Sequence, residues 1–131
     1  EQHLKGLSND VYHHCLYAVQ EIKRVQEACT DLLKENYMAF GKKMFETHKG
    51  LSEMYQVSCV ELDFLVQFAA KHKDVLGARM MGGGFGGCTL NLIKNEGVSD
   101  FIDRVSEAYL EAFGILPEAY PVTIAEGTSL V

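Results

Sequence analysis

The first half of the chain has the hydrophobic pattern of helices. Apolar residues recur every three or four positions from Val11 to Leu33, which is the spacing expected for one buried face of a long helix. Asn9 and Asp10, at the start of this stretch, are residue types that often begin helices. A second helical pattern runs from about Tyr37 to Tyr55. We therefore predict two consecutive helices.

A third helix is predicted to begin near Ser58. Ser58 and Glu61 have the spacing of a capping box, in which the serine hydroxyl accepts a hydrogen bond from the glutamate amide. Apolar residues then keep helical spacing to about His72, and the pattern breaks at Lys73 and Asp74.

The second half of the chain changes to the pattern of strands. An extended segment at 78–81 leads into a glycine-rich run at 82–87, and residues 88–93 alternate as in a strand with one buried face. Ser99 is placed to cap a fourth helix that Gly114 would end. A last strand is predicted over 119–125, at a sheet edge because Pro121 lacks a backbone donor. The fold class is α+β, with N-terminal helices followed by a small antiparallel sheet and one packed helix.

Composition narrows the class of protein. The length of 131 residues suits a single domain over 1–131, with enough chain to bury a core. Twelve basic against eighteen acidic residues give a net charge of −6, and the absence of a basic run argues against nucleic acid as a partner. No uncharged apolar stretch is long enough to span a membrane. The chain begins at Glu1 without a Met, so we expect it to be a fragment.

The cysteines indicate a reducing compartment. The four residues are far apart and form no CxxC pair, so neither a zinc site nor a disulfide framework is indicated. We expect them to be reduced and the protein to be cytoplasmic. They are Cys15, Cys29, Cys59 and Cys88.

The glycine-rich run is the strongest candidate for a binding site. Glycine loses more backbone freedom on folding than any other residue, so five glycines in six positions need a reason. Such a run lets backbone amides converge on an anion, and phosphate is the natural ligand. It matches neither the P-loop nor the dinucleotide fingerprint. A purely structural hairpin is the alternative. The candidate residues are Gly82, Gly83, Gly84, Phe85, Gly86 and Gly87.

The sequence around this run resembles a known family. Residues 77–93, GARMMGGGFGGCTLNLI, resemble the third conserved motif of galactokinases, within the GHMP kinase superfamily. Residues 55–63 resemble the segment that precedes that motif, and residues 39–48 resemble the upstream helix. The resemblance covers most of 11–93. The chain departs from it at Met81, where threonine is usual, at Val60, where proline is common, and at Tyr17, where many relatives have histidine.

The resemblance implies a fold and an activity. Galactokinases transfer the γ-phosphoryl group of ATP to the anomeric hydroxyl of galactose with Mg²⁺. It implies that this chain is like the C-terminal domain of a GHMP kinase and works with its own N-terminal domain. It places the catalytic Asp and Arg, the sugar contacts and the main phosphate loop upstream of this chain. We therefore predict no catalytic and no metal-binding residue here, and an isolated chain that is inactive.

Several single residues could have either a functional role or a simpler structural one. Phe85 could close the cleft of the phosphate site against water, or it could pack under the loop. We favour packing. Arg79 could contact phosphate, but pairing with a carboxylate is favoured, and Cys88 is expected to be a small core residue and not a nucleophile. Adjacent histidines on a helix point about 100° apart and do not chelate one ion well, so no metal site is predicted at His13 and His14. His48 and His72 are expected to be structural or surface residues and not ligands.

Three alternative functions remain open. The chain could belong to a kinase for N-acetylgalactosamine or another sugar, because the acceptor contacts come mostly from the missing part. It could belong to a non-catalytic kinase-like sensor of sugar and nucleotide. It could also be an α+β domain whose glycine hairpin is only structural.

Overall fold

The described part of the chain, residues 8–125, folds into four α-helices and a two-stranded sheet. The computed structural model describes residues 8–125. The helices are α1 (Asn9–Leu33), α2 (Tyr37–Glu53), α3 (Val60–Lys71) and α4 (Val98–Phe113), with a 3-10 turn η2 (Asn95–Gly97). The strands are β1 (Val75–Met80) and β2 (Thr89–Ile93), which pair antiparallel. The predicted α+β class is confirmed.

The helix starts differ in part from those predicted. The Asn36 side chain accepts a hydrogen bond from the Ala39 amide at the start of α2. The residue that caps α3 is Cys59, and the predicted capping box at Ser58 is wrong because the Ser58 hydroxyl donates to Asp63 instead. Gly97, not Ser99, precedes α4. The predicted end of α4 is confirmed, since Gly114 adopts φ +70° there.

The sheet contains two strands within the described residues. Ala78 lies opposite Asn91 and Met80 opposite Thr89, so residues 81–88 form the hairpin connection. The strand predicted over 119–125 is wrong, because these residues are exposed and form no ladder hydrogen bonds with the described sheet. A strand without a paired neighbour leaves its backbone groups to water. The C-terminal residues 126–131 lie outside the described part.

The hydrophobic core lies between the sheet and α3 and α4. Leu62 and Met80 are the largest fully buried side chains. Phe64 contributes to an aromatic cluster, with its ring centroid 5.2 Å from that of Phe113 on α4. The buried residues that pack together are Val66, Ala69, Ala78, Phe101 and Val105. Phe101 and Val105 therefore mark the face of α4 that packs into this core.

Helix α2 crosses strand β1 at very short range. A Cβ atom added at Gly41 would lie 2.0 Å from the Leu76 carbonyl oxygen, and one added at Gly77 would lie 2.4 Å from the Gly41 Cα. Distances this short exclude any side chain at either position. Gly41 weakens the helix by propensity alone, but it lets the helix backbone rest on the strand.

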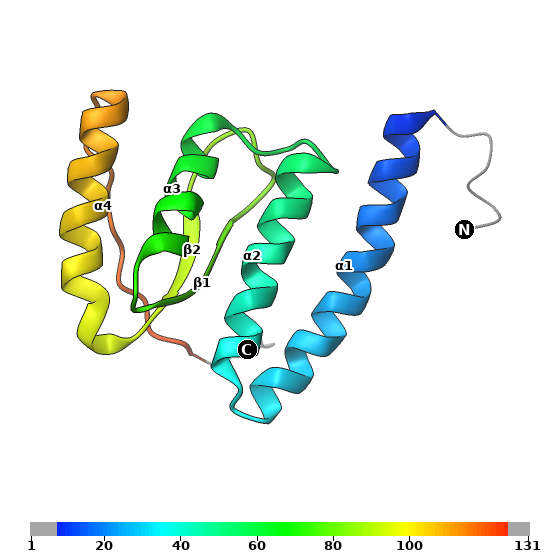
Figure 1. Cartoon of the computed structure of the whole chain (residues 1–131), viewed down its shortest axis with the longest axis horizontal. Helices are drawn as coiled ribbons and strands as arrows, with labels where there is room; N and C mark the ends of the chain where they lie inside the picture. Colours follow the sequence, from blue (N-terminus) through cyan, green and yellow to red (C-terminus); the bar gives the residue numbers. More distant parts are fainter. Residues whose placement is uncertain (1–7, 126–131) are drawn as a thin grey trace, which may run out of the picture.

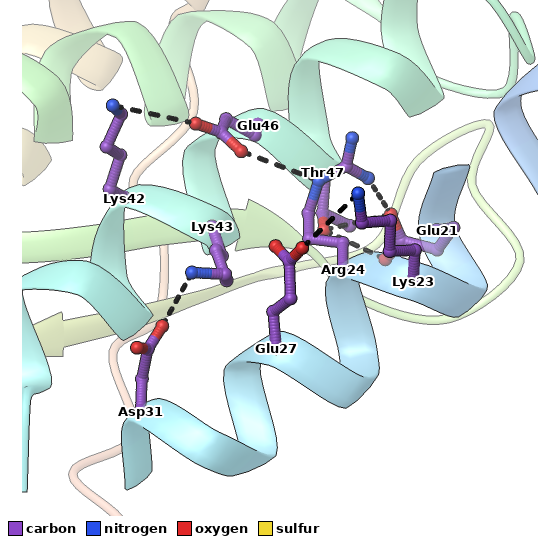
Figure 2. Close-up of polar contacts among 9 residues, drawn as sticks. All are labelled: Glu21, Lys23, Arg24, Glu27, Asp31, Lys42, Lys43, Glu46 and Thr47. Atoms are coloured by element: carbon purple, nitrogen blue, oxygen red, sulfur yellow. Dashed lines mark hydrogen bonds and ion pairs between the residues drawn. The ribbon is translucent and has the colours of Figure 1, made fainter. Parts of the chain in front are cut away.

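Helix α1 packs against α2 through a polar side. Figure 2 shows the contacts, in which Lys43 meets Asp31 at 2.6 Å and the Thr47 hydroxyl donates to Glu21 at 2.8 Å. Arg24 pairs with Glu21 and lies 3.6 Å from Glu46. Tyr17 is the one residue of α1 that is buried.

The apolar side of α1 is exposed, which corrects the prediction that it is buried. We define this side by Val11, Val19, Ile22, Val25 and Leu32, all of which are exposed, with 66% of Val19 and 64% of Ile22 accessible. In Figure 1, α1 stands at the edge of the molecule beside α2. Hydrophobic spacing identifies which side of a helix is apolar, but it does not say what covers that side.

Candidate functional site

The glycine-rich run forms an exposed loop between the two strands. Positive φ angles occur at Gly82, Gly84, Gly86 and Gly87, and also at Phe85. Gly84 needs glycine for two reasons. Its φ of +89° is costly for other residues, and a Cβ there would lie 2.0 Å from the Val57 carbonyl oxygen.

Most of the loop amides are available to a ligand. The Phe85 amide donates to the Val57 carbonyl at 2.7 Å, and the Met81 amide donates to the Cys88 carbonyl at 3.0 Å, which closes the base of the loop. Within residues 8–125, the amides at 82, 83, 86 and 87 donate to no backbone carbonyl. The loop is therefore not a hairpin whose amides are used up by its own strands.

The segment that contains the loop carries no acidic side chain of its own. Residues 79–91 include Arg79 but no Asp or Glu, although the whole chain carries a net charge of −6. Backbone amides in such a segment favour an anion such as phosphate over a cation.

Three side chains at the loop differ from their predicted roles. The Phe85 ring is 76% exposed, so the packing role is wrong. Cys88 is exposed and not a core residue. Arg79 forms no ion pair with a carboxylate among the described residues, and its Nε donates to the Met80 carbonyl at 3.0 Å. The pairing favoured from sequence is therefore wrong.

A buried histidine supports the strand that enters the loop. The Met80 amide donates to His48 Nδ1 at 3.2 Å, and His48 Nε2 lies 3.1 Å from Asp63 Oδ1. The Asp63 carboxylate also accepts from the Ser58 hydroxyl at 2.6 Å and from the Ser52 hydroxyl at 2.9 Å. This group joins α2, α3 and β1.

Sequence reasoning found only part of this group. His48 was expected to be structural, and its burial and two partners confirm that. His72 is confirmed in the same role, since its Nε2 lies 2.9 Å from Asp100 Oδ2. Asp63 was missed as a functional residue. The available signal was its place at the end of the 55–63 segment, five residues after Ser58.

Comparisons with known proteins decide the family. The family described as GHMP kinases C terminal matches residues 21–111. The chain belongs to the GHMP kinases. Proteins named galactokinase are 40% identical to it, from Clostridium acetobutylicum over 88% of this chain and from Bacillus subtilis over 85%. This GHMP kinase chain spans only 30% and 28% of the length of these two relatives.

A solved structure has the same fold. The crystal structure of Lactococcus lactis galactokinase complexed with galactose matches with a TM-score of 0.80 and 35% sequence identity. The match covers 83% of this GHMP kinase chain and 28% of the Lactococcus chain.

In 8–125, no three His, Cys, Asp or Glu side chains gather in a way that could hold a metal ion. No helix in that range is long and apolar enough to cross a membrane.

His48 is expected to make the stability of this GHMP kinase domain sensitive to mild acid. Burial lowers the pKa of His48 below its usual 6.5, the Arg79 guanidinium adds to this, and the Asp63 carboxylate opposes it. The charged residues Lys49 and Glu53 of α2 line a surface pocket together with His48. As pH falls below 6.5 the unfolded chain takes up the proton first. The free energy of unfolding should therefore fall until pH reaches the folded pKa, by at most about 1.4 kcal/mol per pH unit.

Urea unfolding between about pH 7.5 and pH 5 measures this dependence. The matched control is His48→Gln, which cannot titrate at this position, so its unfolding free energy should depend less on pH over the same range. An equal slope in both proteins would show that His48 does not bind its proton differently in the folded and unfolded chain.

Proposed function

We propose that residues 1–131 are the C-terminal domain of a galactokinase. In this proposal the whole protein transfers the γ-phosphoryl group of ATP to galactose and forms galactose 1-phosphate. The named galactokinases at 40% identity and the match to a galactokinase complexed with galactose support it. The observation that carries it is an exposed glycine loop, in a GHMP kinase domain, whose amides at 82, 83, 86 and 87 donate to no backbone carbonyl within residues 8–125.

The loop would line the phosphate side of the cleft. Phosphoryl transfer depends mainly on positioning and on stabilising charge on the phosphoryl oxygens. The amides at 82, 83, 86 and 87, which donate to no backbone carbonyl within residues 8–125, would be the groups that face such oxygens. ATP supplies the transferable group when bound. We assign the Mg²⁺ ligands, the catalytic Asp and Arg and most galactose contacts to the part of the protein outside this chain, as the family resemblance implies.

The apolar side of α1 fits a contact with that remaining part. Helix α1, which carries these five exposed apolar residues, lies on the opposite flank of the molecule from α4 in Figure 1. The relatives are about three times as long as this chain, so ample sequence exists to cover it. Burying such a side removes apolar surface from water and stabilises the whole protein. We therefore take the N-terminal part of the same protein as its occupant.

Ile22→Asp tests this contact. Ile22 is 64% exposed in this chain, so the variant should change the unfolding free energy of the isolated chain by less than about 0.5 kcal/mol. In the full-length protein the same carboxylate would be buried without a partner, and we expect a loss of about 3 kcal/mol or more. Thermal and urea unfolding of both lengths give the comparison.

Lys23→Asp is the matched control. Lys23 neighbours Ile22, and its side chain is 78% exposed. It should be tolerated at both lengths. Equal tolerance of Ile22→Asp in the full-length protein would show that the N-terminal part does not cover this side of α1.

The function itself is tested by ADP formation. The full-length protein should produce ADP with ATP, Mg²⁺ and galactose, and this chain alone should not. Galactose and N-acetylgalactosamine should then be offered in competition. A preference for N-acetylgalactosamine would move the assignment to the sister kinase. Binding of sugar and nucleotide without turnover would favour the sensor.

A further inference from the structure

The glycine loop is held at two points that lead back to one carboxylate. Met80, two residues before the loop, is held through its amide by His48, which contacts Asp63. The Phe85 amide, at the far side of the loop, is held by the Val57 carbonyl. Val57 is followed by Ser58, whose hydroxyl donates to the same Asp63 carboxylate.

We propose that His48, Asp63 and Ser58 are positioning residues that set the place of the glycine loop for phosphoryl transfer. The inference rests on the proposed function, and it assigns to three buried or half-buried side chains a part in the rate of the reaction. None of them touches the reacting atoms in this proposal.

His48 can bridge its two partners in only one neutral form. Because Nδ1 accepts from the Met80 amide, the proton must be on Nε2, which donates to Asp63. The His48 side chain is 8% exposed, so water does not replace either bond easily. His48 therefore joins α2, the end of β1 and α3 in a fixed geometry.

Asp63 connects that bridge to the second anchor. Its Oδ1 accepts from both His48 and Ser58, while its Oδ2 accepts from Ser52 of α2. The Ser58 bond is short at 2.6 Å, as expected for a hydroxyl and a charged carboxylate. A shift of Asp63 would move the strand end and the Val57 carbonyl together.

The loop depends on these anchors because it has few others. The Phe85 ring is exposed, and Cβ atoms added at 82, 83, 86 or 87 would meet nothing within 4 Å. Little packing therefore restrains the loop apart from the Val57 contact and the strand ends. In enzymes a displacement of about 1 Å can cost roughly 100-fold in rate.

A pair of serines separates positioning from stability. Ser58→Ala and Ser52→Ala each remove one hydroxyl from Asp63, but only Ser58 lies next to the carbonyl that holds the loop. In the full-length protein, Ser58→Ala should speed amide hydrogen exchange in peptides covering 80–88 and lower kcat about tenfold, a modest loss for a displaced loop. Ser52→Ala should leave both within about twofold, because it spares the Val57 anchor.

His48 is tested by a conservative rescue. His48→Leu removes both bonds, whereas the side-chain oxygen of His48→Asn lies near the place of Nδ1 and can still accept from the Met80 amide. We expect faster exchange at 80–88 and a larger fall in kcat for His48→Leu than for His48→Asn. Should His48→Leu fail to fold, the serine pair still decides the proposal.

The outcomes distinguish this inference from the proposed function. If the wild-type protein forms no ADP with any sugar, the proposed function fails, while the exchange comparison still shows whether the three residues hold the loop. If Ser58→Ala and Ser52→Ala have equal exchange at 80–88, or equal kcat in an active enzyme, the positioning role is overturned.

Discussion

Gly41→Ala is expected to destabilise the domain by about 3 kcal/mol or more, because a methyl group has no room where α2 crosses β1. The new Cβ would lie 2.0 Å from the Leu76 carbonyl oxygen, and the three atoms nearest to it all belong to the backbone of Leu76 and Gly77, so no rotamer change can move them away. Helix propensity alone would favour alanine by about 1 kcal/mol. The clash should therefore reverse the sign of the effect, which urea unfolding will measure.

Gly83→Ala is the control for this experiment. Gly83 is exposed, and a Cβ there meets nothing within 4 Å. The unfolding free energy should stay within about 0.5 kcal/mol of the parent. If Gly41→Ala had the same unfolding free energy as Gly83→Ala, α2 and β1 could not cross this closely.

The helices and strands could be predicted because their patterns are local. Gly114 ends α4 as expected, with the left-handed angle that glycine tolerates. The antiparallel pair around the loop follows from two extended segments joined by a flexible turn. The exception is the segment 119–125, whose β-like sequence forms no strand because no described strand pairs with it.

Tertiary contacts could not be predicted, because a pattern in one sequence does not identify which side chains will contact each other. The Ser58 hydroxyl is equally suited to a helix amide or to a carboxylate, and only folding brings Asp63 within 2.6 Å of it. The apolar side of α1 is similar. Its spacing is plain in the sequence, yet the side that packs on α2 is the polar one with Glu21 and Asp31.

The glycines show the same limit within the candidate site. The sequence indicates a loop of five glycines that suits an anion, but it treats all five alike. In the structure, Gly84 is packed against Val57 at a positive φ, whereas Gly83 has open space around it. Substitution of Gly84 by alanine would displace the loop. The same substitution at Gly83 would add a methyl group to a loop that keeps its position.

Gly84→Ala is therefore expected to impair the full-length enzyme strongly. The methyl group would lie 2.0 Å from the Val57 carbonyl oxygen, and the φ of +89° would add backbone strain. The hydrogen bond from the Phe85 amide to Val57 should break, because the loop must move away. We expect kcat/KM for ATP to fall about 100-fold, as for other misplaced active-site groups. Steady-state ADP formation is the measurement.

Gly114→Ala is the matched control for backbone strain. Gly114 also has a positive φ, of +70°, but a Cβ there meets nothing within 4 Å, and it lies at the end of α4. It should lose about 1 kcal/mol of stability while kcat/KM stays near the parent value. Both variants place alanine at a positive φ, but only Gly84→Ala also meets the Val57 carbonyl. A similar loss of activity in both variants would therefore mean that reduced stability, and not a displaced loop, explains the effect. Full activity in Gly84→Ala would remove the loop from the phosphate site.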